Sequence, residues 1–315
     1  MNNGAVLEQI KKQNKIIIAG HTNPDGDAIG ACFAFAHALK NIGKKSKILL
    51  EAFSSTYEFL PTPVEVVHQL DPEEKIDLFI ALDCGDEQRL NSYVPYLKNA
   101  TSTINIDHHT SNTMYGDYNI VSEEVSSTCE LLYDLFEEWQ IPITSSIALC
   151  LYTGIVYDTG SFQHTSTTPK THWIASHLLK HKIDSSFVSH QLFHRRSYEK
   201  TKLLGTTLAR ASLYYHDQVS LSFASWAETK SLGTGDTEGI VQFLAEIDDV
   251  SVAVFLYELY PNEVKVSLRS RDDVNVAAVA SQFGGGGHIK AAGCTIFAPV
   301  EEAKRLVLEA LEDFF

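Results

Sequence analysis

Residues 15–28 have the sequence KIIIAGHTNPDGDA, and this stretch decides how the first half of the chain folds. The apolar run Lys15–Gly20 is typical of a buried strand, and a helical pattern of apolar residues occupies Ala28–Asn41. A tight loop joins the two, and it carries three side chains that can bind a metal: His21, Asp25 and Asp27. A buried strand that leads through a short loop into a helix is the building block of a parallel sheet.

The alternation of strand and helix continues through residue 185. We predict further strands at Ser46–Leu50, Asp77–Leu82 and Ser102–Ile106. We predict helices at Val64–Leu70, Thr128–Trp139, Ser145–Val156 and Pro169–Lys180. Strands spaced by helices predict an α/β fold with a doubly wound, mostly parallel sheet. In such sheets, ligands bind outside the carboxyl ends of the strands.

The second half of the chain follows a different pattern. Three segments alternate apolar and polar residues, as strands with one solvated face do: Gln218–Ala224, Val252–Leu259 and Val264–Arg269. Helical patterns occupy Ser186–Arg210, Thr237–Ile247 and Pro299–Phe314. We therefore predict two unlike α/β domains, a larger one over residues 1–185 and a smaller one over 214–315, joined by a connecting helix or linker over 186–213.

The composition limits the partners and the compartment. The 315 residues carry a net charge of −15, which disfavours binding to long or duplex nucleic acid, because such binding depends on many Lys and Arg contacts to phosphates. No apolar run approaches the ~18 residues of a transmembrane helix, and the first residues lack the apolar core of a signal peptide. The five cysteines form no C-x-x-C pair, which indicates buried thiols. We expect a cytoplasmic protein without a membrane partner.

Four short motifs supply hard metal ligands: the loop at residues 21–27, Asp83, the run Asp107-His108-His109, and Asp158. Three of them directly follow predicted strands, so they should converge at one edge of the sheet. Three of the four have a structural alternative when taken alone. Asp27 could cap the helix that follows it, Asp83 could be a buried carboxylate bonded to backbone amides, and Asp158 could lie in a turn. Together the four favour a two-metal hydrolytic site.

The type of ligand narrows the choice of metal. Carboxylate and imidazole groups without a thiolate suit two Mn²⁺ ions, with Mg²⁺ or Co²⁺ as alternatives, better than a structural zinc site. Two such ions roughly 3.5–4 Å apart need a bridging ligand, which a carboxylate or a water molecule can provide. A site of this kind predicts a metal-dependent phosphoesterase.

These motifs resemble those of a known family. HTNPDGDA at residues 21–28, the single Asp83, and Asp107-His108-His109 followed by the Asp158 segment are similar to the sequential motifs of the DHH phosphoesterases. The run GGGGHIKAAG at residues 284–293 resembles the glycine-rich signature of the associated DHHA1 domain. In size and motif order the chain most resembles the family's bacterial bifunctional oligoribonucleases and 3′-phosphoadenosine 5′-phosphate phosphatases, the nanoRNases.

The resemblance implies a role for each motif residue. One Mn²⁺ would be held by His21, Asp25 and Asp83, and the other by Asp27, Asp83, His108 and Asp158, with Asp83 as the bridge. His109 would contact the scissile phosphate and act as a general acid, and Asp107 would orient an imidazole. In the second domain, the residues that would bind a phosphate or a base of the substrate are Arg269, Arg271, Gly285, Gly286, Gly287 and His288.

The resemblance also implies the substrates. These are short single-stranded RNA or DNA oligonucleotides, linear dinucleotides, and nucleotide bisphosphates such as 3′-phosphoadenosine 5′-phosphate. An inorganic pyrophosphatase, a single-strand exonuclease of the same superfamily and a non-catalytic nucleotide sensor stay open as alternatives. The complete set of metal ligands argues against the sensor. The oligomeric state, including a homodimer, stays open as well.

Overall fold

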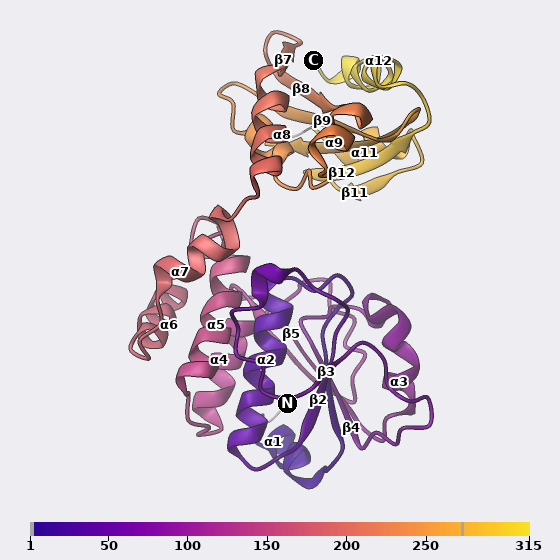
Figure 1. Cartoon of the computed structure of the whole chain (residues 1–315). Helices are drawn as coiled ribbons and strands as arrows, with labels where there is room; N and C mark the ends of the chain where they lie inside the picture. The colour runs from indigo at the N-terminus through magenta and orange to yellow at the C-terminus, as the bar shows by residue number, and fades with distance from the viewer. Residues whose placement is uncertain (1–2, 272–273) are drawn as a thin grey trace. The chain divides into compact units, whose positions relative to one another are not determined.

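The computed structural model describes residues 3–271 and 274–315 of the chain (Figure 1). The chain divides into two compact units, one ending at Arg195 and the other beginning at Arg196. Each unit has its own sheet and its own hydrophobic core. Within the described residues, no helix is long and apolar enough to cross a membrane.

The sheet of the first unit is parallel throughout its described residues. Its strands pair in the order β3-β2-β1-β4-β5-β6. They are β1 (Ile16–Ala19), β2 (Ser46–Leu49), β3 (Val66–Val67), β4 (Leu78–Leu82), β5 (Thr103–Asp107) and β6 (Tyr118–Val121). The strand order reverses between β1 and β4, and a ligand site is expected at the carboxyl ends of the strands that flank such a reversal. The predicted doubly wound, parallel sheet is confirmed.

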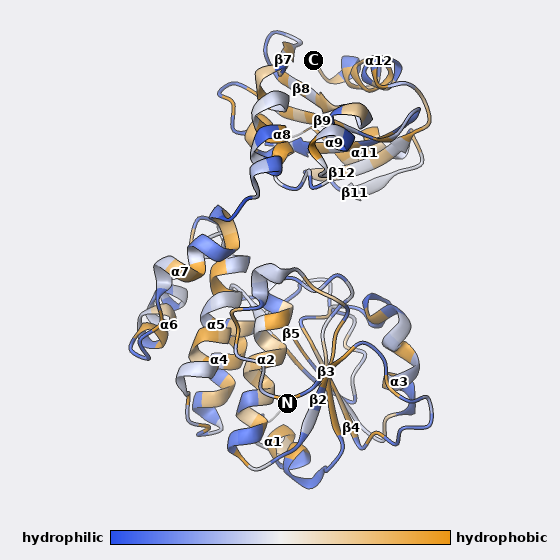
Figure 2. Cartoon of the chain, viewed as in Figure 1, coloured by the Kyte–Doolittle hydropathy of each residue, from blue (hydrophilic) through white to orange (hydrophobic). Residues whose placement is uncertain are grey.

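Helices cover both faces of this sheet (Figure 1). The helices of this unit are α1 (Asn3–Lys12), α2 (Gly26–Asn41), η1 (Ser55–Tyr57), η2 (Glu87–Tyr93), α3 (Val94–Asn99), α4 (Thr128–Glu138), α5 (Ser145–Asp158), α6 (Pro169–Leu179), α7 (Ser185–Ser189) and the π-helix η3 (His190–His194). Successive strand side chains point to opposite faces. Ile16 and Ile18 therefore share a core with α1, α2, α4 and α5, while Ile17 and Ala19 share one with η2 and α3. Figure 2 shows hydrophobic residues running along β4 and β5.

Helices α2 and α5 approach each other closely at two glycines. An added Cβ atom at Gly30 would lie 2.6 Å from the carbonyl oxygen of Cys150. An added Cβ atom at Gly154 would lie 2.6 Å from Oδ1 of Asp27 and would also collide with Cys129. Since neither position has room for a side chain, the two backbones themselves set the distance between the helices.

The second unit contains a mixed sheet. Within its described residues the strand order is β11-β12-β10-β9-β8-β7, with β8 and β9 parallel and the other pairs antiparallel. The strands are β7 (Ser212–Tyr214), β8 (Val219–Ala224), β9 (Val252–Tyr260), β10 (Glu263–Ser270), β11 (Gly286–His288) and β12 (Ala291–Ile296). The helices are α8 (Tyr198–Ala209), α9 (Trp226–Leu232), α10 (Ile240–Ala245), α11 (Val276–Ser281), α12 (Val300–Leu311) and the short η4 (Glu312–Phe314).

The two faces of this second sheet are covered differently. Helices α11 and α12 pack against one face, where Val264, Val266 and Leu268 of β10 point. Helices α8 and α10 pack against the other face at Ala253 and Phe255 of β9. On that second face, the outward side chains of β10 are exposed or half-buried rather than part of the core.

Two predicted helices are wrong. The segment predicted as a helix at Val64–Leu70 contains β3, because its adjacent valines extend the sheet beside β2, as β-branched residues favour. The predicted helix at Ser186–Arg210 is interrupted: η3 ends at His194, Arg195 is extended, and the side chain of Ser197 caps a new helix, α8. The break between the two units lies at this interruption.

We predict that Gly30→Ala destabilises the first unit by about 2 kcal/mol or more, because the new Cβ atom must push α2 away from α5. Thermal unfolding followed by circular dichroism measures the change. Gly205→Ala is the matched control, since Gly205 lies inside α8 with open space around it. That control should keep or slightly raise Tm. Equal Tm values for Gly30→Ala and the wild type would contradict the close contact.

Candidate metal centre and recognition residues

The carboxyl ends of three parallel strands bring the predicted ligands together. β1 leads to the loop with His21, β4 leads to Asp83, and β5 leads to His108. Among the described residues, the donor atoms form three groups whose members lie within 4.8 Å of one another: His21, Asp25 and Asp83; Asp27, His108 and Asp158; and Asp83, His108 and His109. The side chains that the sequence predicts as metal ligands therefore do converge.

Asp83 lies at the centre of this cluster. Its backbone has a φ of +55°, in the left-handed region that few residues with a side chain adopt. Its Oδ2 atom lies 3.7 Å from Nε2 of His21, and its Oδ1 atom lies 3.6 Å from Nε2 of His108. The two oxygens thus face two different imidazoles.

His21 and Asp25 are oriented by the backbone around them. Nδ1 of His21 donates to the carbonyl oxygen of Thr22 at 2.7 Å, so Nε2 is the nitrogen that faces Asp83. Oδ1 of Asp25 accepts hydrogen bonds from the amides of Asp27 and Ala28 and thereby caps α2. The cap is therefore Asp25, and the alternative interpretation of Asp27 as the helix cap is wrong.

The N-terminus of α4 holds Asp27 in place. The amides of Thr128 and Cys129 donate to the two oxygens of Asp27 at 2.7 and 3.0 Å. The hydroxyl of Thr128 also donates to Oδ1 of Asp83 at 3.0 Å. Backbone amides at a helix N-terminus stabilise negative charge. Sequence analysis predicted that this helix starts at Thr128. The hydrophobic pattern alone did not indicate that the first amides of the helix bind Asp27.

His109 is held by Asp107. Nδ1 of His109 donates to Oδ1 of Asp107 at 2.7 Å, and the other oxygen of Asp107 accepts from Asn112 at 2.6 Å. Asn112 also donates to the buried Asn105 at 2.8 Å. This network leaves Nε2 as the ring nitrogen of His109 that can exchange a proton with a substrate. Sequence analysis missed both asparagines, although Asn105 is a polar residue between two buried isoleucines.

The protonation of the cluster reflects its excess of negative charge. Burial and the charge of Asp25 raise the pKa of Asp83 to about 6. Burial and the charge of Asp83 raise the pKa of Asp27 well above its usual range. Burial opposes the protonation of His108, yet its hydrogen bond with Asp158 and the charge of Asp27 raise its pKa to about 10. Divalent cations can replace protons that are held in this way.

The predicted recognition residues lie in the second unit. Arg269 on β10 and His288 on β11 both pair with Ala291 of β12, so they flank one position of the sheet. Gly287 has a φ of +144° and an added Cβ atom there would lie 2.5 Å from the carbonyl oxygen of Ala291, so this position requires glycine. Arg271 instead donates to the carbonyl oxygen of Ile247, at 3.3 Å. The structure brings Arg269 and His288 together and directs Arg271 towards the loop after α10.

Comparison with known proteins agrees with this architecture. The model of the DHH family, N-terminal domain, matches residues 15–155, and that of the DHHA1 domain matches residues 221–315. The sequence is 31% identical over 314 residues to the bifunctional oligoribonuclease and PAP phosphatase NrnA of Thermus thermophilus, covering 98% of this chain and 93% of that protein. The chain belongs to the DHH family. The resemblance inferred from its motifs is confirmed, and the DHH protein is a hydrolase that acts on phosphoester bonds.

Other relatives of this DHH protein also match it over nearly its whole length. The NrnA of Bacillus subtilis is 26% identical to this chain, and the match covers 96% of each protein. The crystal structure of an exopolyphosphatase-related protein from Bacteroides fragilis is 26% identical, with a TM-score of 0.87 and coverage of 99% of this chain and 96% of that one. The exonuclease RecJ bound to manganese has a TM-score of 0.57 at 16% identity, with coverage of 99% and 93%, which is a likeness of fold.

We predict that Asp83→Asn raises the Tm of the metal-free protein at pH 8 and reduces the further rise that Mn²⁺ causes. The pKa of Asp83 in the folded protein is raised to about 6, so protonation of this carboxyl stabilises the fold. That stabilisation is lost as the pH rises from about 4 through 6. At pH 8 the substitution removes a buried charge that costs about 3 kcal/mol. Differential scanning calorimetry at pH 5 and pH 8, with EDTA or with Mn²⁺, measures both effects.

Asp134→Asn is the matched control, because Asp134 lies on α4 in a largely exposed ion pair with Lys170. It should change neither the metal-free Tm at pH 8 nor the response to Mn²⁺ by a comparable amount. A lower metal-free Tm for Asp83→Asn, together with an unchanged Mn²⁺ response, would contradict both the charge argument and the assignment of Asp83 as a ligand.

Proposed function

We propose that this protein is a Mn²⁺-dependent phosphoesterase that hydrolyses short single-stranded oligonucleotides and 3′-phosphoadenosine 5′-phosphate. The observation that carries the proposal is the position of Asp83 between two groups of metal-binding side chains. The relatives named as bifunctional oligoribonucleases and PAP phosphatases support the choice of substrates, since the match to them extends over nearly the whole chain.

The donor set fits two divalent cations. One group offers His21, Asp25 and Asp83, and the other offers Asp27, His108 and Asp158. Oxygen and imidazole donors without a thiolate favour Mn²⁺, with Mg²⁺ or Co²⁺ as alternatives. When bound, two such cations would lower the pKa of a water molecule and offset charge on the phosphate oxygens.

His109 supplies the proton in this proposal. Its hydrogen bond to Asp107 outweighs burial and raises its pKa, so the ring stays protonated to a higher pH than an ordinary histidine. Burial opposes the ionisation of Asp107, but the hydrogen bonds from His109 and Asn112 lower its pKa and keep it charged. A charged Asp107 fixes the orientation of the ring, and Nε2 can then protonate the leaving oxygen.

In this proposal, residues of the second unit bind the substrate. Arg269 and His288 flank Ala291, and the glycine at 287 keeps that part of β11 free of a side chain. A guanidinium beside exposed backbone amides suits a phosphate group of the substrate. Because binding and bond cleavage use different residues, the two contributions can be measured separately.

We predict that activity with Mn²⁺ is highest on oligonucleotides of roughly two to five residues, given a lower limit of ~4 nucleotides for small single-strand sites. The net charge of −15 leaves no long basic track for a longer strand. The measurement is kcat/KM on 5′-phosphorylated 2-mers to 24-mers at one ionic strength, with a duplex 24-mer and 3′-phosphoadenosine 5′-phosphate alongside. Equal values for 3-mers and 24-mers would make a single-strand exonuclease the better account.

We predict that Arg269→Ala and His288→Ala each raise KM for a 5′-phosphorylated trinucleotide by about tenfold or more, since each removes a charge-assisted or polar contact. Hydrolysis of bis(p-nitrophenyl) phosphate, which carries no distal phosphate, should stay near the wild-type rate. Arg305→Ala is the control, because Arg305 pairs with Glu302 and Glu309 on α12. Equal losses on both substrates would argue against a recognition role.

A further inference from the structure

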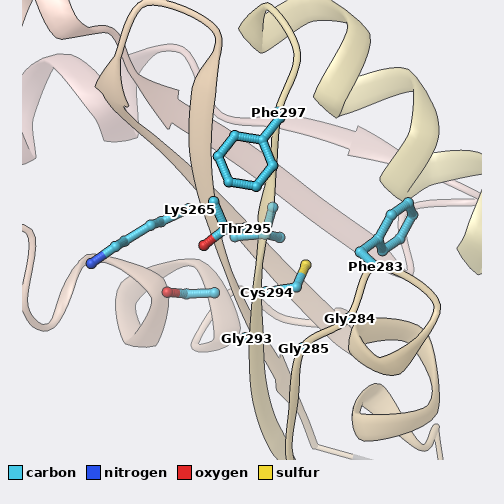
Figure 3. Close-up of a pocket in the computed structure, with 10 residues that line it drawn as sticks. Lys265, Phe283, Gly284, Gly285, Gly293, Cys294, Thr295 and Phe297 are labelled. Atoms are coloured by element: carbon cyan, nitrogen blue, oxygen red, sulfur yellow. The ribbon is translucent and has the colours of Figure 1, made fainter.

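A trough on the second unit lies beside the predicted recognition residues. It encloses about 530 Å³ between β10, β12 and the start of the glycine run. Figure 3 shows Phe297 above Thr295, with Lys265 on one side and Phe283 on the other. The backbone of Gly285 and Gly293 forms the lower part of its wall.

The trough belongs to the incompletely covered face of the sheet. Val264, Val266 and Leu268 point into the core with α11 and α12, so the alternate residues of β10 point the other way. Lys265 pairs with Thr295 across β10 and β12, and both lie on that other face. The helix-covered core on this side ends at β9, which leaves the trough open to solvent.

The chemistry of the trough suits a flat, negatively charged ligand. Phe297 is 80% exposed, an unusual position for a large apolar ring. Gly293 contributes no side chain, so this part of the trough is bounded by backbone. Lys265 is exposed and has no ion-pair partner among the described residues. An aromatic ring, a flat wall and one lysine together match a nucleobase and an adjacent phosphate.

The trough lies on the same face of the sheet as the recognition residue Arg269. Arg269, Ser267 and Lys265 are alternate residues of one strand, so they lie on one face. At ~3.4 Å per residue, Lys265 lies roughly 13–14 Å along β10 from Arg269. That separation is within the reach of a short oligonucleotide, so a strand held at Arg269 can place one base against Phe297.

We propose that Phe297 and Lys265 form a nucleobase subsite, in which Phe297 stacks on one base of the oligonucleotide and Lys265 binds a neighbouring phosphate. The subsite extends the recognition face and rests on the proposed function, because its ligand is part of that substrate. It explains how an acidic protein can prefer oligonucleotides over simple phosphate esters. Stacking is tolerant of sequence, so the subsite contributes affinity without selecting a particular base.

The test combines the protein variant with changes in the substrate. KM is measured for 5′-phosphorylated triadenylate and for three trinucleotides that each carry one abasic residue. Phe297→Ala should raise KM for the intact trinucleotide about tenfold, and that increase should disappear for one abasic position. An unchanged KM for intact triadenylate, or the same increase for all three abasic substrates, would overturn the proposal.

Two control variants and one rescue variant sharpen this test. Phe314→Ala and Lys304→Met alter an exposed aromatic and a lysine at the C-terminal helix, which packs on the opposite face, and both should leave KM unchanged. Lys265→Met should raise KM and reduce its dependence on salt. Phe297→Tyr should restore most of the affinity. Loss of affinity in the controls, or no rescue by tyrosine, would contradict stacking.

A binding measurement separates failure of this subsite from failure of the proposed function. Phe297→Trp places a fluorescent indole in the trough, and in metal-free protein triadenylate should quench it while inorganic phosphate should not. Quenching without any hydrolysis by the wild-type enzyme would retain the subsite and reject the proposed function. Hydrolysis without quenching, at triadenylate concentrations well above KM, would reject the subsite and retain the function.

Discussion

The first unit depends on one electrostatic constraint, which is the burial of several carboxylates at the ends of parallel strands. Asp27 and Asp83 are almost completely buried, and no lysine or arginine pairs with them among the described residues. Part of the cost is offset by the amides at the start of α4 and by the hydroxyl of Thr128. The rest requires protons or cations. The loop after β1, the left-handed backbone at Asp83 and the placement of α4 all serve this need.

The sequence was sufficient to predict those parts of the fold that depend on local patterns of apolar and polar residues. The apolar run before His21 and the helix after it predicted β1 and α2, and the alternation that followed predicted a doubly wound sheet. The expected parallel direction of the strands was then enough to place the predicted ligands at the carboxyl ends. The predicted ligands converge because they follow parallel strands, and the alternation of strands and helices in the sequence was enough to reveal that parallel arrangement.

The missing parts depend on contacts between residues far apart in the chain. Thr128 and Cys129 lie about a hundred positions from Asp27, and nothing in their local pattern indicates that their amides face it. Asn105 belongs to a network that also includes Asn112. The strand β3 forms because its neighbour is β2, so propensity alone could not assign it. The interruption of the predicted helix at Arg195 likewise depends on an extended backbone conformation, which the spacing of apolar residues does not indicate.

The contact of α2 with α5 through Gly30 and Gly154 has a consequence for how the protein can vary. Asp27 lies at the start of α2 and Asp158 at the end of α5, so the spacing of these two predicted ligands depends on a contact between backbones. Changes in the size of core side chains elsewhere leave that contact intact. The apolar core of the first unit can therefore diverge widely among relatives while the separation of the two carboxylates stays constant.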